Sequence, residues 1–188
     1  VYPEIQDLWN QPSFLASTGI GINCSVNSCL NKLLWFQKNQ TAIWKKTAFL
    51  LSLPDYLTFC LTGVRLCDTG TASLLGILDL KKKSWNKDSL MALQLDESLL
   101  SQIDFPGTLV GEISIKKTAQ TAGLPTGIPF ILGSLDHYMA AVGADLGEAA
   151  QATISLGTVV ACVSHTQEFY PQRNICVASA IKGQGYYQ

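Results

Sequence analysis

The chain has 188 residues, 47% of them hydrophobic, and a formal net charge of −1 at pH 7. This composition is typical of a globular core and argues against disorder, and the length allows one domain, or one domain and part of a second. Lysines occur only in short groups such as Lys81–Lys83, so binding to nucleic acid or to a membrane surface has little support.

The six cysteines are scattered along the chain, without a CxxC pair or the spacing of a metal site. Their density is far below that of a disulfide scaffold, which indicates a reducing compartment. The start of the chain has no signal-peptide pattern, and no apolar run is long enough to span a membrane. We therefore expect a cytoplasmic protein with no metal site and no nucleic-acid or membrane partner.

Residues 1–26 are predicted to be irregular, because prolines and glycines interrupt this segment. Helical periodicity then predicts a helix over residues 28–39, with Ser28 or Asn27 as its N-cap. A second helix is expected over residues 41–48. The N-terminal quarter of the chain should therefore place only these two helices against a core.

Pro54 is expected to open a helix that runs to Leu61, and the glycine that follows the helix is a good stop signal. Asp68 begins a stretch rich in capping and turn residues and should start a short helix. A further helix is predicted from Trp85 to Leu95.

The next segment contains a single-turn piece at Glu97–Ile103 and a short strand at Val110–Ile113. Ser114 is expected to cap a helix that ends at Gly123, where a Gly-Leu-Pro sequence gives a clear stop. An apolar, β-branched run then predicts a buried strand over residues 128–133.

A small-residue helix is predicted over residues 137–145, and the pattern changes to strands after Gly147. We take this glycine as a domain boundary, which divides the chain into residues 1–147 and 148–188. The strands of the second part are expected at 151–156, at 159–164 and near 175–180.

The most informative segment is Gly133–Ala144, where Asp136 follows the buried strand and stands at the N-cap of the next helix. Open α/β sheets place their ligands at this end of a strand. Downstream, Gly157 and Thr158 form a turn that could offer backbone N–H groups to a phosphate. A carboxylate for a substrate hydroxyl and a loop for a phosphate together indicate a phosphotransferase.

The apolar runs on either side of this turn predict a β-hairpin over residues 151–164. Its tip would carry Gly157 and Thr158 and point back toward Asp136. If the tip pointed away from this carboxylate, the phosphate-binding role of the turn would have no basis.

Simpler interpretations stay open for the same residues. Asp136 could be only a helix cap, and the Gly157–Thr158 turn only a hairpin turn. His137 and His165 have no metal partner at ligand spacing and are expected to be ordinary helix or surface residues. Ser114–Lys117 matches the SxxK of acylating serine enzymes, but the companion motifs are absent. The four tryptophans are expected to be packing residues, although one near a cleft could stack on a sugar.

A series of short motifs extends over nearly the whole chain. They are Lys32-Leu33-Leu34-Trp35, Asp55-Tyr56-Leu57 with Leu61-Thr62-Gly63, Asp68 with Ala72 and Ser73, Trp85, Pro106-Gly107 with Gly111, Gly123-Leu124-Pro125 with Gly127 and Pro129, Gly133 and Asp136 with Ala140, Ala141 and Gly143, and Ser155-Leu156-Gly157-Thr158. In their order and spacing, these motifs resemble those of the FGGY family of carbohydrate kinases.

The resemblance implies an α/β fold of the ribonuclease H-like type, shared with actin and hexokinase. It implies that Asp136 is the catalytic base and faces a hydroxyl of a sugar or polyol. It also implies that Gly157 and Thr158 hold the phosphates of ATP, which acts with Mg²⁺. Residues 1–147 would be the C-terminal part of the sugar-binding domain, and residues 148–188 the start of the nucleotide-binding domain.

The resemblance also implies a central portion of a kinase, because a complete member begins with an Asp-x-Gly-Thr phosphate loop and this sequence does not begin with one. We therefore expect the isolated chain to be inactive. The alternative is a non-catalytic fragment that keeps the kinase fold as a structural or protein-interaction module. Unpaired strand edges in residues 151–164 would favour a homodimer.

Overall fold

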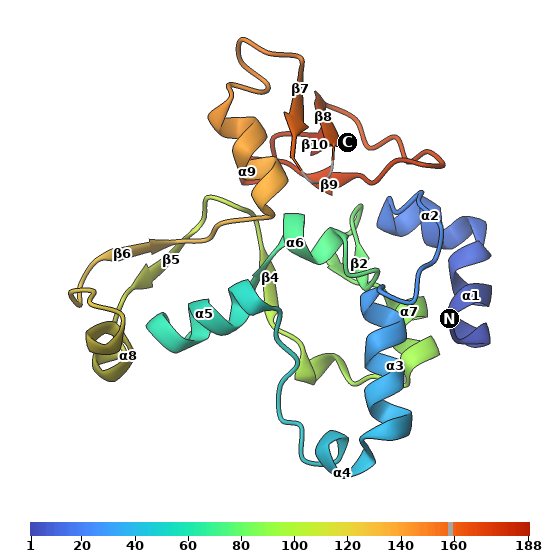
Figure 1. The fold of residues 1–188 in the computed structure, drawn as a ribbon, viewed down its shortest axis with the longest axis horizontal. Helices are drawn as coiled ribbons and strands as arrows, with labels where there is room; N and C mark the ends of the chain where they lie inside the picture. The colour runs from blue at the N-terminus through green and yellow to red at the C-terminus, as the bar shows by residue number, and fades with distance from the viewer. Residues whose placement is uncertain (158–159) are drawn as a thin grey trace.

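The computed structural model describes residues 1–157 and 160–188 and mixes helices with short strands (Figure 1). The helical segments are α1 (Pro3–Asn10), α2 (Pro12–Thr18), α3 (Cys29–Asn39), α4 (Thr41–Trp44), α5 (Leu53–Thr62), α6 (Thr69–Ser73), α7 (Lys87–Leu93), η1 (Glu97–Leu99), α8 (Lys116–Thr121), α9 (Asp136–Gly143) and η2 (Ile181–Gly183). The strands are β1 (Leu66–Asp68), β2 (Leu78–Asp79), β3 (Ser84–Trp85), β4 (Gln102–Asp104), β5 (Leu109–Glu112), β6 (Pro129–Ile131), β7 (Ala152–Leu156), β8 (Val160–Thr166), β9 (Ala178–Ser179) and β10 (Tyr186–Tyr187).

Two prolines begin the first two helices, so the prediction of an irregular N-terminal segment is wrong. Pro3 and Pro12 stand in the first turns of α1 and α2. At that position the missing proline N–H breaks no helical hydrogen bond, and the fixed φ suits a helix. Ile5 and Phe14 then bury their side chains in the core. The same prolines that indicate a break in the chain therefore mark helix starts.

The helices α3 and α5 confirm the predictions made from their capping residues. Ser28 caps α3 by accepting a hydrogen bond from the N–H of Asn31. Ser52 and Asp55 form a reciprocal capping box at the start of α5, and the helix ends at Gly63 with a left-handed φ of 79°. The helix expected over 41–48 is limited to the single turn of α4.

The strands β1 and β4 form a short parallel pair that the sequence did not reveal. Cys67 pairs with Ile103, and Asp68 pairs with Asp104. A strand of three residues is too short to produce a recognisable alternation of polar and apolar side chains. Asp68 ends β1 and caps α6, as predicted, by accepting a hydrogen bond from the N–H of Thr71 at 2.7 Å.

Two predicted boundaries in the following segment are wrong. The helix expected over Trp85–Leu95 begins only at Lys87, because Asn86 caps it. Trp85 instead pairs with Leu78 in the small β2–β3 ribbon. Of the single-turn piece expected over Glu97–Ile103, only the first half is helical, and the second half begins β4. In both cases strand pairing overrides the local helical pattern, with the nearby strand β2 in the first case and the distant strand β1 in the second.

The strands β5 and β6 form a two-stranded antiparallel ribbon that extends with α8 to the left of Figure 1. The buried strand predicted over 128–133 is therefore shorter and more exposed than expected, and Ile131 is 53% exposed. Ser114 does not cap α8. Its hydroxyl donates to the carbonyl oxygen of Thr62 at 3.1 Å, and Ile115 occupies the cap position without a side-chain hydrogen bond.

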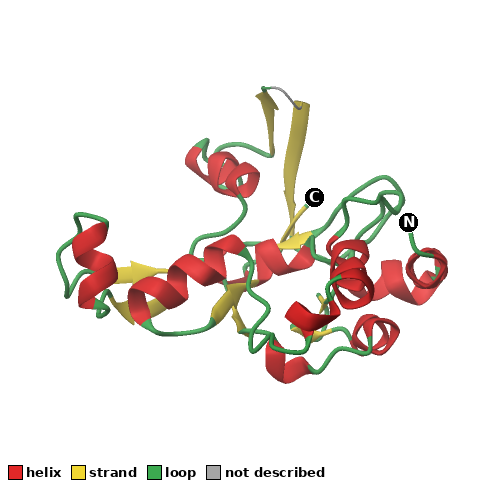
Figure 2. Ribbon diagram, turned by 60° about the horizontal axis from the view of Figure 1, so that its bottom comes forward, coloured by secondary structure: helices red, strands yellow, loops and turns green. Residues whose placement is uncertain are grey.

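The C-terminal segment forms a four-stranded antiparallel sheet in the order β7-β8-β10-β9. The ladder from Ala152↔Ser164 to Leu156↔Val160 confirms the two strands of the predicted hairpin. These strands stand away from the rest of the molecule in Figure 2. The strand expected near 175–180 is limited to β9, and β10 was not predicted.

The buried hydrophobic side chains form two clusters. The first is built from α1, α2, α3, α7 and the strands β1 to β3. The second comprises Tyr138, Ala141, Leu146, Val163, Ala178, Ala180 and Tyr187. The second cluster draws on residues before and after Gly147, and the division into 1–147 and 148–188 stays a prediction.

Backbone hydrogen bonds join the loop after α2 to the segment before β9. The N–H of Gly21 donates to the carbonyl oxygen of Ile175 at 2.7 Å, and the N–H of Val177 donates to that of Gly19 at 2.9 Å.

None of the helices within the two described stretches combines the length and the apolar content that crossing a membrane requires.

Candidate active site

Asp136 is the first helical residue of α9, and Leu135 is the N-cap. The prediction that Asp136 is the N-cap is therefore off by one residue, and its side chain makes no capping hydrogen bond to the helix. Instead, the side chain is 85% exposed. A carboxylate this exposed is accessible to a ligand.

His137 holds the carboxylate from one side. Oδ1 of Asp136 accepts a hydrogen bond from the backbone N–H of His137 at 2.8 Å and lies 2.9 Å from its Nδ1. These contacts, the side-chain hydrogen bond first, lower the pKa of the Asp136 carboxyl. Among the residues that the structure describes, Oδ2 has no hydrogen-bond partner. Asp136 is thus an ionised, acceptor-only group with one open oxygen.

A hollow of about 720 Å³ lies beside the start of α9, and we call it the α9–β8 hollow. It is lined by Ile22, Leu74, Leu135, His137, Tyr138, Val160, Ala161, Cys162, Val163, Ser164, Asn174, Ile175, Cys176 and Gln188. Leu135 and His137 flank Asp136 in sequence and both face this space. Asp136 itself is not among the lining residues and lies in the chain between two residues that are.

The second predicted feature, the phosphate-binding turn, is described only in part. Gly157 follows β7 and is exposed, whereas Thr158 lies outside the described residues. Val160 pairs with Leu156, the last residue of β7. Val160 and His137 both line the α9–β8 hollow. The first residue of β8 and the start of α9 thus border the same space. The direction of the turn itself stays a prediction.

The α9–β8 hollow offers little to a charged ligand. No Lys, Arg, Asp or Glu stands among its described lining residues. Within residues 1–157 and 160–188, no three His, Cys, Asp or Glu side chains gather in a metal-binding group. The described residues therefore do not fit a site for Mg²⁺.

A hydrogen bond that sequence reasoning missed joins the approach to Asp136 to the first core. Ser134, two residues before Asp136, donates its hydroxyl proton to Oδ1 of Asp68 at 2.6 Å. Asp68 had been expected only to cap its helix. The two residues are 66 positions apart, and no local pattern in the sequence could have indicated that they meet.

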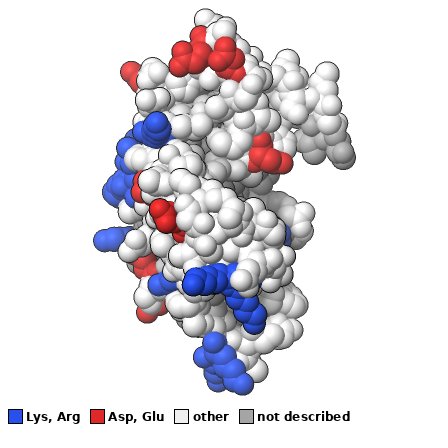
Figure 3. Space-filling model, turned by 90° about the vertical axis from the view of Figure 1, so that its left-hand side faces the viewer, with Lys and Arg blue, Asp and Glu red and all other residues white. Residues whose placement is uncertain are grey.

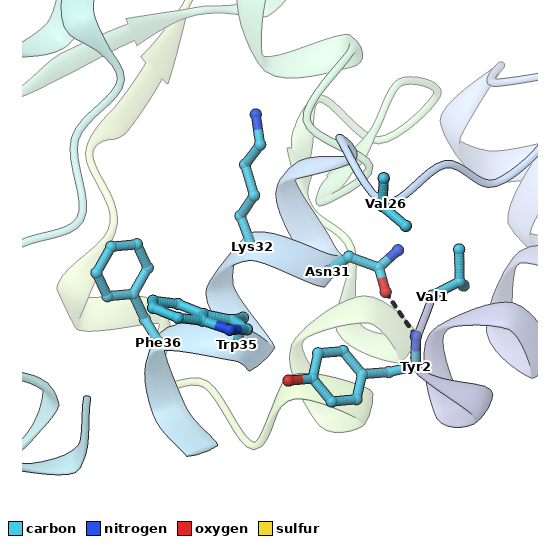
Figure 4. A pocket seen from close by; sticks show the side chains of 7 residues that line it. All are labelled: Val1, Tyr2, Val26, Asn31, Lys32, Trp35 and Phe36. Atoms are coloured by element: carbon cyan, nitrogen blue, oxygen red, sulfur yellow. Dashed lines mark hydrogen bonds between the residues drawn. The ribbon is translucent and has the colours of Figure 1, made fainter. Parts of the chain in front are cut away.

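The tryptophans do not reach the α9–β8 hollow. Trp85 is buried and donates its Nε1–H to the carbonyl oxygen of Ser101. Trp35 is 44% exposed and lines a separate apolar pocket of about 350 Å³ between α3 and the start of the chain (Figure 4). There the backbone N–H of Tyr2 donates to Oδ1 of Asn31. This pocket contains no carboxylate that could accept a proton from a substrate hydroxyl.

His165 contacts other parts of the protein. His165 lies in β8, with Nε2 2.7 Å from the carbonyl oxygen of Gln184 and its ring against Tyr187. These contacts hold a strand against a loop and do not form a ligand site.

On the face drawn in Figure 3, Lys and Arg side chains form separate groups, and acidic side chains gather toward the upper end.

The family model for the N-terminal domain of the FGGY family of carbohydrate kinases matches residues 1–143. The chain belongs to the FGGY family of carbohydrate kinases. It is 30% identical over 131 residues to the autoinducer-2 kinase of Salmonella typhimurium, a match that covers 70% of this chain and 24% of that protein. The autoinducer-2 kinase of Escherichia coli strain K12 is 28% identical over the same length. The chain thus spans only about a quarter of the length of these curated relatives.

Solved structures of FGGY kinases have the same fold. The xylulose kinase of Rhodospirillum rubrum matches 98% of this chain with a TM-score of 0.87 at 21% identity, over 37% of its own length. The gluconate kinase of Lactobacillus acidophilus matches 97% of this chain with a TM-score of 0.81 at 23% identity, also over 37%. The predictions of the family and of the actin- and hexokinase-like α/β fold are confirmed. The roles of Asp136, Gly157 and Thr158 stay predictions.

Proposed function

We propose that this chain is part of an ATP-dependent carbohydrate kinase in which Asp136 accepts the proton of a substrate hydroxyl. The observation that carries the proposal is the ionised, exposed Asp136 carboxylate, with Oδ2 open, at the start of α9 in an FGGY-family chain, between two residues that line the α9–β8 hollow. The substrate class is a small hydroxylated molecule, either a sugar, a sugar acid or a polyol.

In the proposed reaction, Asp136 orients the hydroxyl so that its oxygen attacks the γ-phosphorus of ATP. The bond between the γ-phosphorus and the bridging oxygen breaks, ADP leaves, and Oδ2 of Asp136 takes the hydroxyl proton. Phosphoryl transfer depends mainly on positioning and charge neutralisation. A carboxylate with a lowered pKa is therefore adequate, because the proton moves late in the reaction. Gly157 and Thr158 are proposed to hold the phosphates of ATP.

We also propose that the isolated chain does not phosphorylate a sugar. The described lining of the α9–β8 hollow has no cationic side chain for a triphosphate, and positioning a polyanion without such contacts gives little binding energy. The second candidate function, a structural or protein-interaction module, is supported by the apolar surface of the β7–β8 hairpin. Leu156 is 81% exposed and Val160 is 67% exposed. Such a surface favours a homodimer.

The catalytic role is tested in a complete enzyme rebuilt around this sequence. The variant Asp136→Asn removes the proton acceptor and keeps the size of the side chain. It should lower kcat by about a hundred- to ten-thousand-fold, the usual contribution of a general base, while ATP binding persists. The matched control is Asp145→Asn, an exposed carboxylate just beyond the other end of α9, which should leave kcat unchanged. An active Asp136→Asn enzyme would overturn the assignment.

A further inference from the structure

The contact between Ser134 and Asp68 is short and partly buried. Oδ1 of Asp68 accepts the Ser134 hydroxyl at 2.6 Å and, at the same time, the backbone N–H of Thr71 at 2.7 Å. Asp68 is 1% exposed. Hydrogen bonds to a carboxylate are shorter and stronger than those between neutral groups, and burial shields them from water. The contact is therefore suited to holding a chain segment in place.

Gly70 makes room for this contact. A Cβ atom at Gly70 would clash with Oγ of Ser134 and would lie 3.0 Å from Oδ1 of Asp68. Its backbone is ordinary α-helix within α6, so a larger residue would be tolerated by the local conformation. The absence of a side chain at Gly70 thus serves the close approach of Ser134 rather than an unusual φ angle.

The acceptor Asp68 belongs to a rigid part of the molecule. It ends β1, which pairs with β4, and it caps α6, which packs against β9. Cys67 and Ala72, on either side of it, are both fully buried. By contrast, the connection that carries Ser134 lies between the end of β6 at Ile131 and the start of α9. The hydrogen bond ties this irregular connection to the core.

We propose that Asp68, Gly70 and Ser134 form a positioning device, the Asp68–Ser134 latch, that sets the place of Asp136 for the reaction. Asp68 and Ser134 are positioning residues, since neither would touch the substrate. The inference rests on the proposed function of Asp136. The exposed Asp136 side chain is held only through its backbone and through His137 among the described residues. A displacement of about 1 Å can cost about a hundredfold in rate.

The first experiment measures the latch in the 188-residue chain without any turnover. The variant Ser134→Ala removes the donated hydroxyl and leaves the cap of α6 intact. The matched control Ser73→Ala removes a fully buried hydroxyl of the neighbouring helix α6, which donates to the carbonyl oxygen of Gly70 at 2.6 Å. The readout is amide hydrogen exchange at Tyr138 and Met139, whose N–H groups donate to the carbonyl oxygen of Leu135 at the start of α9.

Loss of a hydrogen bond to a buried carboxylate should speed exchange at these two amides about tenfold more in Ser134→Ala than in Ser73→Ala. Equal acceleration in both variants would overturn the latch, because a general loss of stability would then explain the effect. The variant Gly70→Ala should also speed exchange, since its new methyl group expels the Ser134 hydroxyl. Adding Ser134→Ala to Gly70→Ala should bring little further change.

The second experiment connects the latch to catalysis in the rebuilt complete enzyme. Ser134→Ala should lower kcat about tenfold or more with little change in the KM for the sugar, whereas Ser73→Ala should not. An unchanged kcat in Ser134→Ala would overturn the positioning role even if exchange accelerates. If Asp136→Asn were active, the proposed function would fail, and the exchange result would still decide whether the latch holds α9.

Discussion

Asp136 and Asp55 are carboxylates with opposite environments. Asp136 is exposed, and the hydrogen bond from His137 lowers its pKa. Asp55 is 4% exposed, and burial raises its pKa, despite hydrogen bonds from Ser52 and Ser101 that act in the other direction. A low pKa keeps a reactive carboxylate charged and available at the surface. A raised pKa marks a structural carboxylate whose charged form is costly to bury.

The raised pKa of Asp55 predicts an unusual pH dependence of stability. Its folded-state pKa lies above the unfolded value of about 3.9, so the native state binds this proton more tightly. The stabilisation is therefore fully present below the unfolded value and is lost as the pH rises through the raised folded value. Asp55 should make the chain more stable as the solution is acidified within this window.

The variant Asp55→Asn cannot titrate and should remove this contribution. Urea unfolding between about pH 4 and 7 should show a smaller gain, or a larger loss, of unfolding free energy on acidification than in the parent chain. The control is Asp96→Asn, because hydrogen bonds from Ser98 lower the pKa of that exposed carboxyl. Its removal should act in the opposite direction. An unchanged pH profile in Asp55→Asn would contradict the role assigned to Asp55.

At the scale of single elements, the predictions succeeded where the signal is local. Ser28 and Gly63 delimit helices through contacts within four residues, and both were predicted correctly. Pro12 gives the same local signal for a helix start and for a break, and only burial of the neighbouring side chains decides between them. Ser114 resembles a cap, but its hydroxyl donates to the distant carbonyl oxygen of Thr62, and Ile115 occupies the cap position.

At the candidate site, too, the sequence predicted the local feature and missed the long-range contact. Asp136 was found from the sequence, because it follows an apolar run and opens a helix. The bond from Ser134 to Asp68 was not found, because it joins residues 66 positions apart and depends on the packing of α6. Local chemistry therefore indicates the proposed proton acceptor, whereas the contacts that support it are a property of the tertiary structure.

Gly63 gives a direct test of how a helix ends. It has a φ of 79° at the end of α5, and the nearest atom to an added Cβ would be Cδ1 of Ile115 at 3.7 Å, an ordinary contact. The cost of Gly63→Ala therefore comes from backbone strain alone and should be about 1 kcal/mol of unfolding free energy. Denaturant unfolding measures this loss.

The matched control for this variant is Gly143→Ala at the end of α9. The position lacks a positive φ and has no atom within 4 Å of an added Cβ. Alanine is the better helix former, so the control should be neutral or slightly stabilising. If both variants cost the same, the left-handed backbone at Gly63 would not be the reason for the loss.

On the scale of the whole molecule, the two hydrophobic clusters border the α9–β8 hollow without providing it with charge. His137 and Cys176 both face the hollow, but its described lining carries no Lys or Arg. Calorimetry of the isolated chain with ATP and Mg²⁺ should therefore show weak or no binding. Sub-millimolar affinity together with sugar phosphorylation by the isolated chain would contradict the proposed inactivity.

The β7–β8 hairpin has an exposed apolar face at the edge of its sheet. Ile154 and Leu156 lie on one face of β7, opposite Cys162 and Val160 of β8. Ile154 is 66% exposed, and α9 packs near Val163 in the second cluster rather than over these residues. The strand β7 is also the outermost of its sheet. An apolar face beside an unpaired strand edge favours pairing with a second copy.

Light scattering should therefore give the isolated chain a mass above that of the monomer, and Leu156→Lys should shift it toward the monomer. A lysine at this 81% exposed position adds a charge to the pairing face without disturbing the core. The matched control is Met91→Lys, which changes a 74% exposed apolar residue on α7. This control should leave the mass unchanged, since it lies on another element. A monomeric parent chain, or an equal effect of the two lysines, would show that the hairpin does not mediate self-association.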